Sequence, residues 1–313
     1  MLRYTIRRVL ILIPLFLALS VLLFFYVHAV PGDPIAGMLG PNGTPELIAQ
    51  IRADRGLDRP LLVQYGDWLA GLVHGDLGVS LISGQEVTPV VVNRIPATVQ
   101  LTLAGLVFTV LIGLPAGFYA GKNRGSWLDR VLSPAALLGL SMPVFWIGTL
   151  LILLFAVGLH WLPTGGYVPF SQSPIKSLQL TFMPAFALGI HLSPFLARMV
   201  RATTIELQQE QFVVQARMKG LRARTITYRY LMRNAIVPVL VVLGLQLGAL
   251  LGGQVIIEQL FNWPGVGRLL VEGAIQRDYL IVQSLILVIA AIYVVVNLGV
   301  ELLHAWLDPR VRL

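Results

Sequence analysis

The sequence predicts an all-α integral membrane protein with six transmembrane helices, and three observations support this class. First, the 313-residue chain is 56% hydrophobic and only 12% charged, whereas soluble domains carry about 25% charged residues. Second, its mean hydropathy is +0.78. Third, six windows without charged residues are each long enough to cross a bilayer, which takes about 20 mostly apolar residues. Because backbone groups in lipid must bond within the segment, each window is expected to be helical.

The first window covers residues 9–30 and follows a basic start, so it resembles a signal peptide, with Val27-His28-Ala29 as a weak small-residue site. Its apolar run is longer than the 7–15 residues of a signal core, so we expect a retained first helix. The other windows are 97–121, 132–158, 178–197, 236–257 and 280–300. Prolines lie within or at the ends of these windows at Pro14, Pro115, Pro143, Pro184 and Pro194. Since neighbouring helices can satisfy the freed carbonyls, we expect tolerated kinks.

The distribution of Lys and Arg predicts that both termini are cytoplasmic. With that orientation the inner segments hold 16 of the 23 basic residues and 5 of the 15 acidic ones. The net charge of +8 is therefore a topology signal, and it does not indicate nucleic-acid binding. We expect a protein that crosses the lipid bilayer six times.

The windows divide the chain into four parts: an N-terminus with the first helix (1–30), an extracytoplasmic insertion (31–95), a five-helix core (96–303) and a cytoplasmic C-terminus (304–313). The insertion contains "TPELIAQIRADRGLD", which predicts a helix that begins at Thr44 or Pro45 and stops at Gly56. We therefore expect a small folded module there. Further outer loops are expected at 159–177 and 258–278.

Sequence motifs for catalysis and cofactor binding are absent. There is no G-x-x-x-x-G-K-[ST] phosphate loop, no H-E-x-x-H and no G-x-S-x-G nucleophile turn. The five histidines have no close metal-ligand spacing, and there are no cysteines. We therefore expect a non-catalytic chain with no cofactor or metal of its own.

A basic loop at 205–235, on the predicted cytoplasmic side, departs from the apolar pattern. In "LQQEQFVVQARMKG", helical spacing places Phe212, Gln215, Ala216 and Lys219 on one face, and Gly220 is a typical helix stop. A second amphipathic stretch, 224–235, leads back towards the membrane. Such a unit cannot bury itself alone, so it either docks in a groove of another protein or lies on anionic lipid. These patterns by themselves leave both readings open.

The segment from "QARMKG" to "RNAIVP" resembles the coupling loop of ABC-importer permeases, whose motif reads E-A-A-x-x-x-G with a later apolar-Pro pair. Val214 and Gln215 replace the Glu and the first Ala, while Ala216 and Gly220 match. The long spacing from Gly to Pro is similar to the dipeptide/oligopeptide/nickel branch. Other segments resemble that branch along nearly the whole chain: "VHAVPGDP", "RGLDRPLLVQY", "HGDLGVSL", "RIPATVQLTLAG", "SMPVFWIG", "FNWPGVGRLLVEGAIQRDY" and "LDPRVR". Leu280 stands where the branch usually has Pro.

The resemblance implies a type I importer permease fold and a permease subunit of an ATP-driven, binding-protein-dependent importer in a bacterial-type inner (cytoplasmic) membrane. It implies as partners a second, homologous permease, two cytoplasmic subunits that bind ATP and Mg²⁺, and an extracytoplasmic solute-binding protein. Di- and oligopeptides are the first expectation for the cargo, with nickel or metal chelates, metallophores and glutathione left open. A secondary transporter is a more distant alternative, because no clear repeat is present and the windows lack Asp, Glu, Lys and Arg.

Two sets of site residues follow. The resemblance assigns ATPase coupling to the basic loop, where a small residue at Ala216 permits close helix contact and Gly220 can adopt positive φ. The loop set is Phe212, Gln215, Ala216, Arg217, Lys219, Gly220 and Leu221. Polar groups at membrane depth are candidates for a translocation path, and these are His191, Gln246, Gln254 and Asn297. Because the two glutamines lie among glycines of the fifth window, plain helix packing is an alternative role for them.

Overall fold

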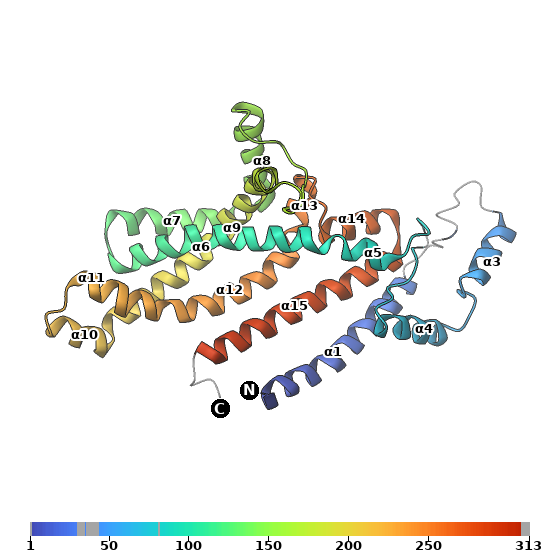
Figure 1. Ribbon diagram of the computed structural model, residues 1–313, viewed down its shortest axis with the longest axis horizontal. Helices are drawn as coiled ribbons and strands as arrows, with labels where there is room; N and C mark the ends of the chain where they lie inside the picture. The colour runs from blue at the N-terminus through green and yellow to red at the C-terminus, as the bar shows by residue number, and fades with distance from the viewer. Residues whose placement is uncertain (1, 30–34, 36–43, 81, 308–313) are drawn as a thin grey trace. The chain divides into compact units, whose positions relative to one another are not determined.

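The computed structural model describes residues 2–29, 35, 44–80 and 82–307, and Figure 1 shows its helices in chain order. Within these ranges the chain is helical apart from loops and one isolated β-bridge, so the predicted all-α class is confirmed. The chain forms two compact units. We call them the N-terminal unit (1–96 with 265–292) and the core unit (97–264 with 293–313).

The core unit is built around α9 (Pro174–Gln209), which at 36 residues spans about 54 Å. Helices α7, α8, α10, α12 and α13 all pack against it. The bounds of these and the remaining core helices are α6 (Ile95–Lys122), α7 (Trp127–Ser141), α8 (Val144–Leu151), α10 (Gln211–Met218), α11 (Ala223–Thr225), α12 (Arg233–Gly253), α13 (Val255–Leu260) and the end of α15 (Tyr279–Leu307).

Glycines spaced four apart bring α6 into backbone contact with α9. A Cβ on Gly113 would lie 2.8 Å from the Ser193 carbonyl oxygen, and one on Gly117 would collide with the Ala197 carbonyl. Further along, a Cβ on Gly121 would lie 2.7 Å from the Arg201 carbonyl oxygen. The contact positions rise together along both helices, so α6 and α9 run parallel. Lipid offers little hydrophobic drive for helices to associate, so this close approach of small residues is what makes the pair stable.

Helix α12 runs in the opposite direction to α6 and α9. Gln254, at its end, bonds Thr102 of α6, and Glu258 in the next helix bonds Thr98, one turn earlier in α6. On another side α12 meets α15, where Gly244 faces Val300 and Gly248 faces Tyr293. These glycines leave room for the larger side chains of α15.

The predicted single helix over 132–158 is wrong. Helix α7 ends at Ser141, Met142 is extended (ψ 124°), and α8 begins after Pro143, followed by a π-helical stretch over Ile152–Gly158. The ring of a proline disfavours the helical conformation for the residue before it, which explains the break. The other four prolines lie inside α1, α6 and α9 as tolerated residues.

Four helices in the described parts of the chain are long and apolar enough to cross a membrane. They are Leu10–Ala29, Val87–Lys122, Pro174–Gln209 and Tyr279–Leu302, with mean hydropathies of 2.8, 2.0, 1.5 and 2.6. A shorter apolar helix covers Val144–Gly158, and α12 occupies the fifth predicted window. The count of six crossings therefore stays a prediction.

In the N-terminal unit, α3 (Pro45–Asp54) confirms the helix predicted in the insertion. Thr44 caps it by accepting from the Leu47 N–H at 3.3 Å, and Gly56 follows it with φ +64°. The other elements of this unit are α1 (Leu2–Ala29), α4 (Leu61–Val73), α5 (Val87–Val92), α14 (Val266–Gln276) and the start of α15.

A buried carboxylate joins two distant segments of this unit. Asp278 is 1% exposed, accepts a short hydrogen bond from the Ser80 hydroxyl and caps the first turn of α15. Ser284, also on α15, donates to the Leu77 carbonyl at 3.2 Å. A cluster of α5, α14 and α15 side chains that includes Val87, Val91 and Leu285 surrounds these bonds. The segment before α5 is thereby fixed to the beginning of the last long helix.

We predict that Gly117→Ala lowers the stability of the protein. The new Cβ meets a backbone carbonyl that cannot rotate away, and overpacking of this kind typically costs about 1–3 kcal/mol. Thermal unfolding in detergent would measure the loss. The matched control is Gly299→Ala on α15, where a Cβ meets nothing within 4 Å and where alanine favours a helix by up to about 1 kcal/mol. Equal melting temperatures for the two variants would contradict the proposed backbone contact.

Candidate functional site

The predicted loop helix is α10, which follows α9 after a one-residue break. Glu210 is extended (ψ 141°) and separates the two helices. At the other end Gly220 has φ +71°, and the N–H groups of Gly220 and Leu221 donate to the carbonyls of Arg217 and Ala216. This is the αL stop that glycine provides at a helix C-terminus. The prediction of a positive φ at Gly220 is therefore confirmed.

The chain then continues in helical form from Ala223 to Gly253, through α11, a π-helical stretch over Ile226–Met232, and α12. The second helical stretch predicted at 224–235 thus lies on the same helical path as α12, as Figure 1 shows. Residues 223–253 therefore form one continuous helical segment.

The face of α10 that is buried differs from the prediction. Val213 and Ala216 are 0% and 3% exposed, and they pack in a cluster with Val200 of α9 and Leu231 of the π-helical stretch. The premise that the loop cannot bury itself is therefore wrong, because the chain covers one side of α10 with its own residues. Ala216 does permit a close helix contact, but that contact lies within the chain.

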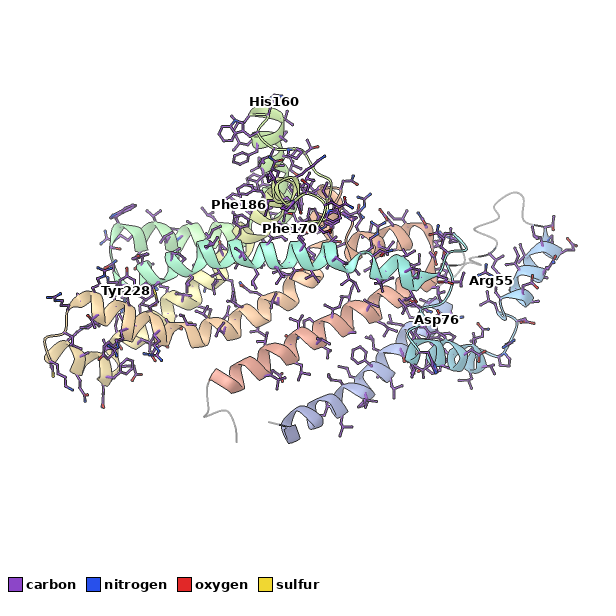
Figure 2. All side chains as sticks on the ribbon, viewed as in Figure 1. Arg55, Asp76, His160, Phe170, Phe186 and Tyr228 are labelled. Carbon is purple, nitrogen blue, oxygen red and sulfur yellow. The ribbon has the colours of Figure 1, made fainter. Side chains whose placement is uncertain are left out.

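The opposite face of α10 is exposed. It carries apolar side chains towards the C-terminal end of the helix, with basic side chains beside them. Met218 is 82% exposed, and Val214 and Leu221 are 37% and 38% exposed. Gln215, Arg217 and Lys219 are exposed, and Phe212, 37% exposed, stacks on Tyr230 at 6.5 Å. In the following stretch, Arg224 lies 6.0 Å from the ring centre of Tyr228, which Figure 2 labels. This arrangement suits a partner with an apolar groove and an acidic rim.

An ion pair fixes the base of this loop. Arg201 on α9 makes two hydrogen bonds to Asp129 on α7, from Nε to Oδ1 at 2.6 Å and from Nη2 to Oδ2 at 3.0 Å. The Asp129 side chain is 7% exposed and also accepts from the Gly125 N–H. Gln208, one residue before the end of α9, donates to the Gly121 carbonyl of α6 at 2.9 Å. The end of α9 from which α10 extends is thereby joined to both α6 and α7.

Two of the four predicted path residues, both glutamines, lie at helix contacts. Gln246, 4% exposed, donates from Nε2 to the Leu192 carbonyl at 3.0 Å, and Gln254, 1% exposed, accepts from Thr102 at 3.0 Å. Among the described residues, Gln246 Oε1, Gln254 Nε2 and His191 Nδ1 are buried without a partner. Asn297 is half-buried on α15. The bonds account for the two glutamines as packing residues, and a role in a path stays a prediction for all four.

A cavity of about 560 Å³ lies between α6, α7 and α9, and none of the four predicted path residues lines it. Most of its lining is small, and Arg198 and Arg201 are its charged residues. The small lining residues are Gly113, Ala116, Gly117, Ala120, Ala135, Ala136, Gly139, Ser193, Ala197 and Ala202.

Two hydrogen bonds form a polar ladder between α6 and the α12–α13 segment, and the sequence did not predict it. Thr98 donates to Glu258 at 3.1 Å, one turn away from the bond between Thr102 and Gln254. Glu258 is 0% exposed, although the sequence places it at the start of an outer loop. The charge ended the apolar window, yet α13 continues past it to Leu260. The hydrogen bond from Thr98 offsets part of the cost of burying this carboxylate. The sequence contains one indication of this ladder: Thr98 and Thr102 are four residues apart, and so are Gln254 and Glu258.

Two protein families match this chain. Residues 113–313 match the family described as "Binding-protein-dependent transport system inner membrane component", and residues 1–102 match the family for the N-terminal part of such components. A putative peptide transport system permease protein of Brucella abortus is 39% identical over 98% of both chains. The glutathione transport system permease protein GsiC of Escherichia coli K12 is 38% identical over 100% of this chain and 99% of its own length.

A solved structure of the MetNI methionine ABC transporter in an inward-facing conformation also resembles this chain. The TM-score is 0.58 over 70% of this chain and 96% of that one, at 17% sequence identity. At this identity the likeness shows the fold alone, and the fold is that of an ABC-importer permease.

We predict that Arg201→Gln destabilises the protein, because it leaves the Asp129 carboxylate buried without its cationic partner. Removing one member of a fully buried pair typically costs about 3–5 kcal/mol. The Arg201 side chain is 32% exposed, so we expect a smaller loss, which thermal unfolding would measure. Arg198→Gln, an exposed arginine on the same helix, is the matched control. Asp129→Asn in the Arg201→Gln background should restore part of the stability. If Arg201→Gln has the same melting temperature as the wild type, the ion pair does not stabilise the base of the loop.

Proposed function

Because this chain belongs to the family of binding-protein-dependent transport system inner membrane components, and so is an ABC-importer permease, we propose that it carries short peptides across the membrane. The observation that supports this cargo is the similarity over 98% of the chain to a putative peptide permease. Glutathione, which is itself a tripeptide, is the second candidate, because a glutathione permease is 38% identical over the whole chain.

We propose that the chain pairs with a second, homologous permease and is not itself catalytic. Two cytoplasmic subunits would bind ATP and Mg²⁺ and hydrolyse the nucleotide, and an extracytoplasmic binding protein would deliver the cargo. Both termini are placed in the cytoplasm. The parallel course of α6 and α9 supports this orientation, because Lys122 then shares a side with the basic loop after α9.

The proposed transport cycle is alternating access, in which partners on each side shift the balance between two states. Closure of the ATPase subunits on ATP would move α10. The buried residues Val213 and Ala216 join α10 to the core unit, and Arg201 joins the adjoining end of α9 to α7. The open face around Met218 and Leu221 is the part that would enter an ATPase groove. Shape should matter more than charge there, because exposed ion pairs contribute about 0–1 kcal/mol each.

We predict that Met218→Glu together with Leu221→Glu separates the permease from its ATPase subunits. The two charges would have to be buried in an apolar groove, so the ATPase recovered with the purified permease should fall at least tenfold. Both side chains are exposed, so the melting temperature of the permease should not change. The matched control is Ile275→Glu, which alters a 77% exposed residue on α14. Undiminished ATPase recovery would refute docking through this face.

We predict that uptake of labelled trialanine into sealed vesicles requires both the binding protein and ATP. Vesicles should contain the assembled importer with its nucleotide site facing the lumen, the binding protein and trialanine should be added outside, and trialanine should accumulate only when ATP is enclosed in the lumen. Unlabelled glutathione as a competitor would reveal whether the tripeptide with a γ-linkage shares the route. Uptake that persists after ATP is removed would contradict an ABC importer and favour a secondary transporter.

A further inference from the structure

The cavity of about 560 Å³ between α6, α7 and α9 has a wall that is apolar except for three side chains. Its volume lies within the range of sites for small ligands, about 300–1,000 Å³. Among the described residues that line it, those with polar side chains are Ser193, Arg198 and Arg201. The partners that these three side chains already have show which chemistry the cavity still lacks.

Two of the three polar side chains are bonded within the chain. Pro194 has no N–H to donate to the carbonyl of Ile190, and the Ser193 hydroxyl donates to that carbonyl instead, at 3.3 Å. Arg201 makes its two hydrogen bonds to Asp129. Neither side chain therefore calls for a ligand.

Arg198 is the polar side chain that remains. It is exposed, and it makes no hydrogen bond or ion pair with any other residue that the structure describes. No Asp or Glu is among the described lining residues, so nothing in the wall opposes its charge. A guanidinium group suits a phosphate, because its planar N–H groups can donate two parallel hydrogen bonds. The cavity therefore favours an anionic group at Arg198.

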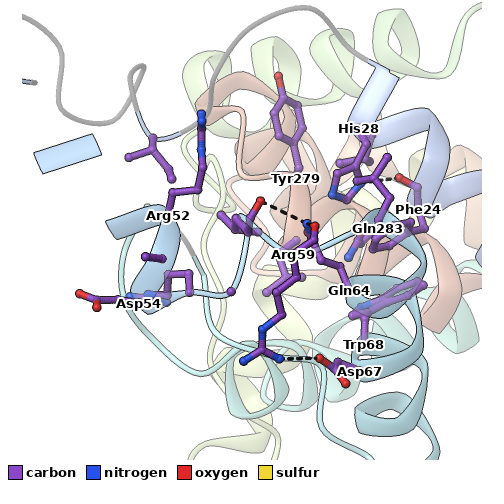
Figure 3. A pocket seen from close by; sticks show the side chains of 18 residues that line it. Phe24, His28, Arg52, Asp54, Arg59, Gln64, Asp67, Trp68, Tyr279 and Gln283 are labelled. Carbon is purple, nitrogen blue, oxygen red and sulfur yellow. Dashed lines mark hydrogen bonds and ion pairs between the residues drawn. The ribbon is translucent and has the colours of Figure 1, made fainter. Parts of the chain in front are cut away.

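The larger cavity of the N-terminal unit, about 710 Å³ and shown in Figure 3, gives no such preference. Its wall carries charges of both signs, and Arg59 donates to Asp67 at 3.2 Å. Gln64 donates to the carbonyls of Leu57 and Arg59. Because these polar groups bond one another, this cavity singles out no class of ligand.

The cavity between α6, α7 and α9 has a charged end and an apolar end. Helix α7 runs antiparallel to α9, because Asp129 bonds Arg201, whereas a Cβ on Gly139, further along α7, would lie 2.8 Å from Pro194, earlier in α9. Small apolar residues such as Ala135 line the space between these ends. The N–H and C=O groups of a peptide would find no free partners along this wall, whereas a hydrocarbon chain needs none.

The length and depth of the cavity match one leaflet of a bilayer. Along α9 its lining residues run from Ile190 to Arg201, a distance of about 16 Å at a rise of 1.5 Å per residue. Half of a hydrocarbon core about 30 Å thick is about 15 Å. In the proposed orientation the charged end faces the cytoplasm, and the apolar window 178–197 stops one residue before Arg198. A partner helix that crosses the whole membrane would need a groove about twice as long.

We propose that this cavity binds one anionic phospholipid of the cytoplasmic leaflet, with its phosphate at Arg198 and an acyl chain between α6 and α7. Basic pockets between transmembrane helices on the cytoplasmic side bind anionic lipid headgroups. The bound chain fills the space beside the ion pair of Arg201 and Asp129, so it supports the packing of α7 on α9 at the base of the basic loop. This inference rests on the proposed orientation and is independent of the cargo.

Native mass spectrometry of the assembled, delipidated importer in detergent tests the phosphate contact. With equal amounts of phosphatidylglycerol and phosphatidylethanolamine added, wild type should retain the anionic lipid in excess. Arg198→Gln should weaken phosphatidylglycerol binding by about tenfold, because a hydrogen bond to a charged group is lost. The matched control is Arg130→Gln, which alters an exposed arginine on α7 that does not line the cavity. This control should bind the lipid as wild type does.

Ala135→Leu tests the acyl-chain contact separately. The larger side chain occupies part of the cavity, so phosphatidylglycerol binding should again fall by about tenfold. The matched control is Ala18→Leu, which alters an exposed alanine on the apolar helix α1. Glycerol 3-phosphate, which has the phosphate without the chains, should not displace the lipid. Displacement would show a site for free phosphate and overturn the proposed lipid.

Melting temperatures separate a lipid site from a structural role. Without lipid, Arg198→Gln should melt as wild type does, because the side chain it alters is exposed. Phosphatidylglycerol should raise the melting temperature of wild type, since a ligand of the folded state stabilises it, and Arg198→Gln should lose this rise.

Equal retention of the two lipids, or unchanged phosphatidylglycerol binding by Arg198→Gln, would overturn the proposal. If Ala135→Leu lost the second permease while its lipid binding stayed intact, the groove would be a contact between permeases and the lipid site would be refuted. Each of these results would leave the proposed transport function standing.

Discussion

The core unit depends on one contact, the backbone approach of α6 to α9 through Gly113, Gly117 and Gly121. In lipid the packing of small residues substitutes for the hydrophobic drive that holds soluble helices together. The contact sets the parallel course of the two helices. It also leaves the remaining sides of α9 free for α7, α8 and α12, so that a single long helix touches most of the core.

This central position gives α9 a mechanical role in the proposed cycle. The carbonyl of Leu192 receives Gln246 of α12, and Arg201 holds Asp129 of α7. After Arg201, α9 leads into α10. The inner face of α10 belongs to the same buried hydrophobic cluster as Val200 of α9. A force on the outer face of α10 therefore reaches three helices through contacts that are buried or charge-assisted, which deform little before they rearrange.

The predictions from sequence succeeded where the signal was local. Thr44 and Gly56 bound α3 because capping and αL geometry depend on neighbouring residues, and the same holds for the stop at Gly220. They failed where the burial of a residue depends on a segment far away in the sequence. Helical spacing places Ala216 on the predicted docking face, yet in the structure it is buried in a cluster with Leu231 and Val200. Glu258 ends an apolar window, yet Thr98, 160 residues earlier in the chain, supplies a hydrogen bond that helps it stay buried.

Sequence alone determined the membrane class, the helical backbone and the family, because charge-free length and short motifs are properties of contiguous residues. Only the tertiary structure decided which side of α10 is open, which glycines touch a backbone, and that Arg198 and Ala135 border the same cavity. Glycine, glutamine and alanine each have the same chemistry in any context. Whether one of them packs, bonds or faces a cavity depends on segments that meet it only when the chain folds.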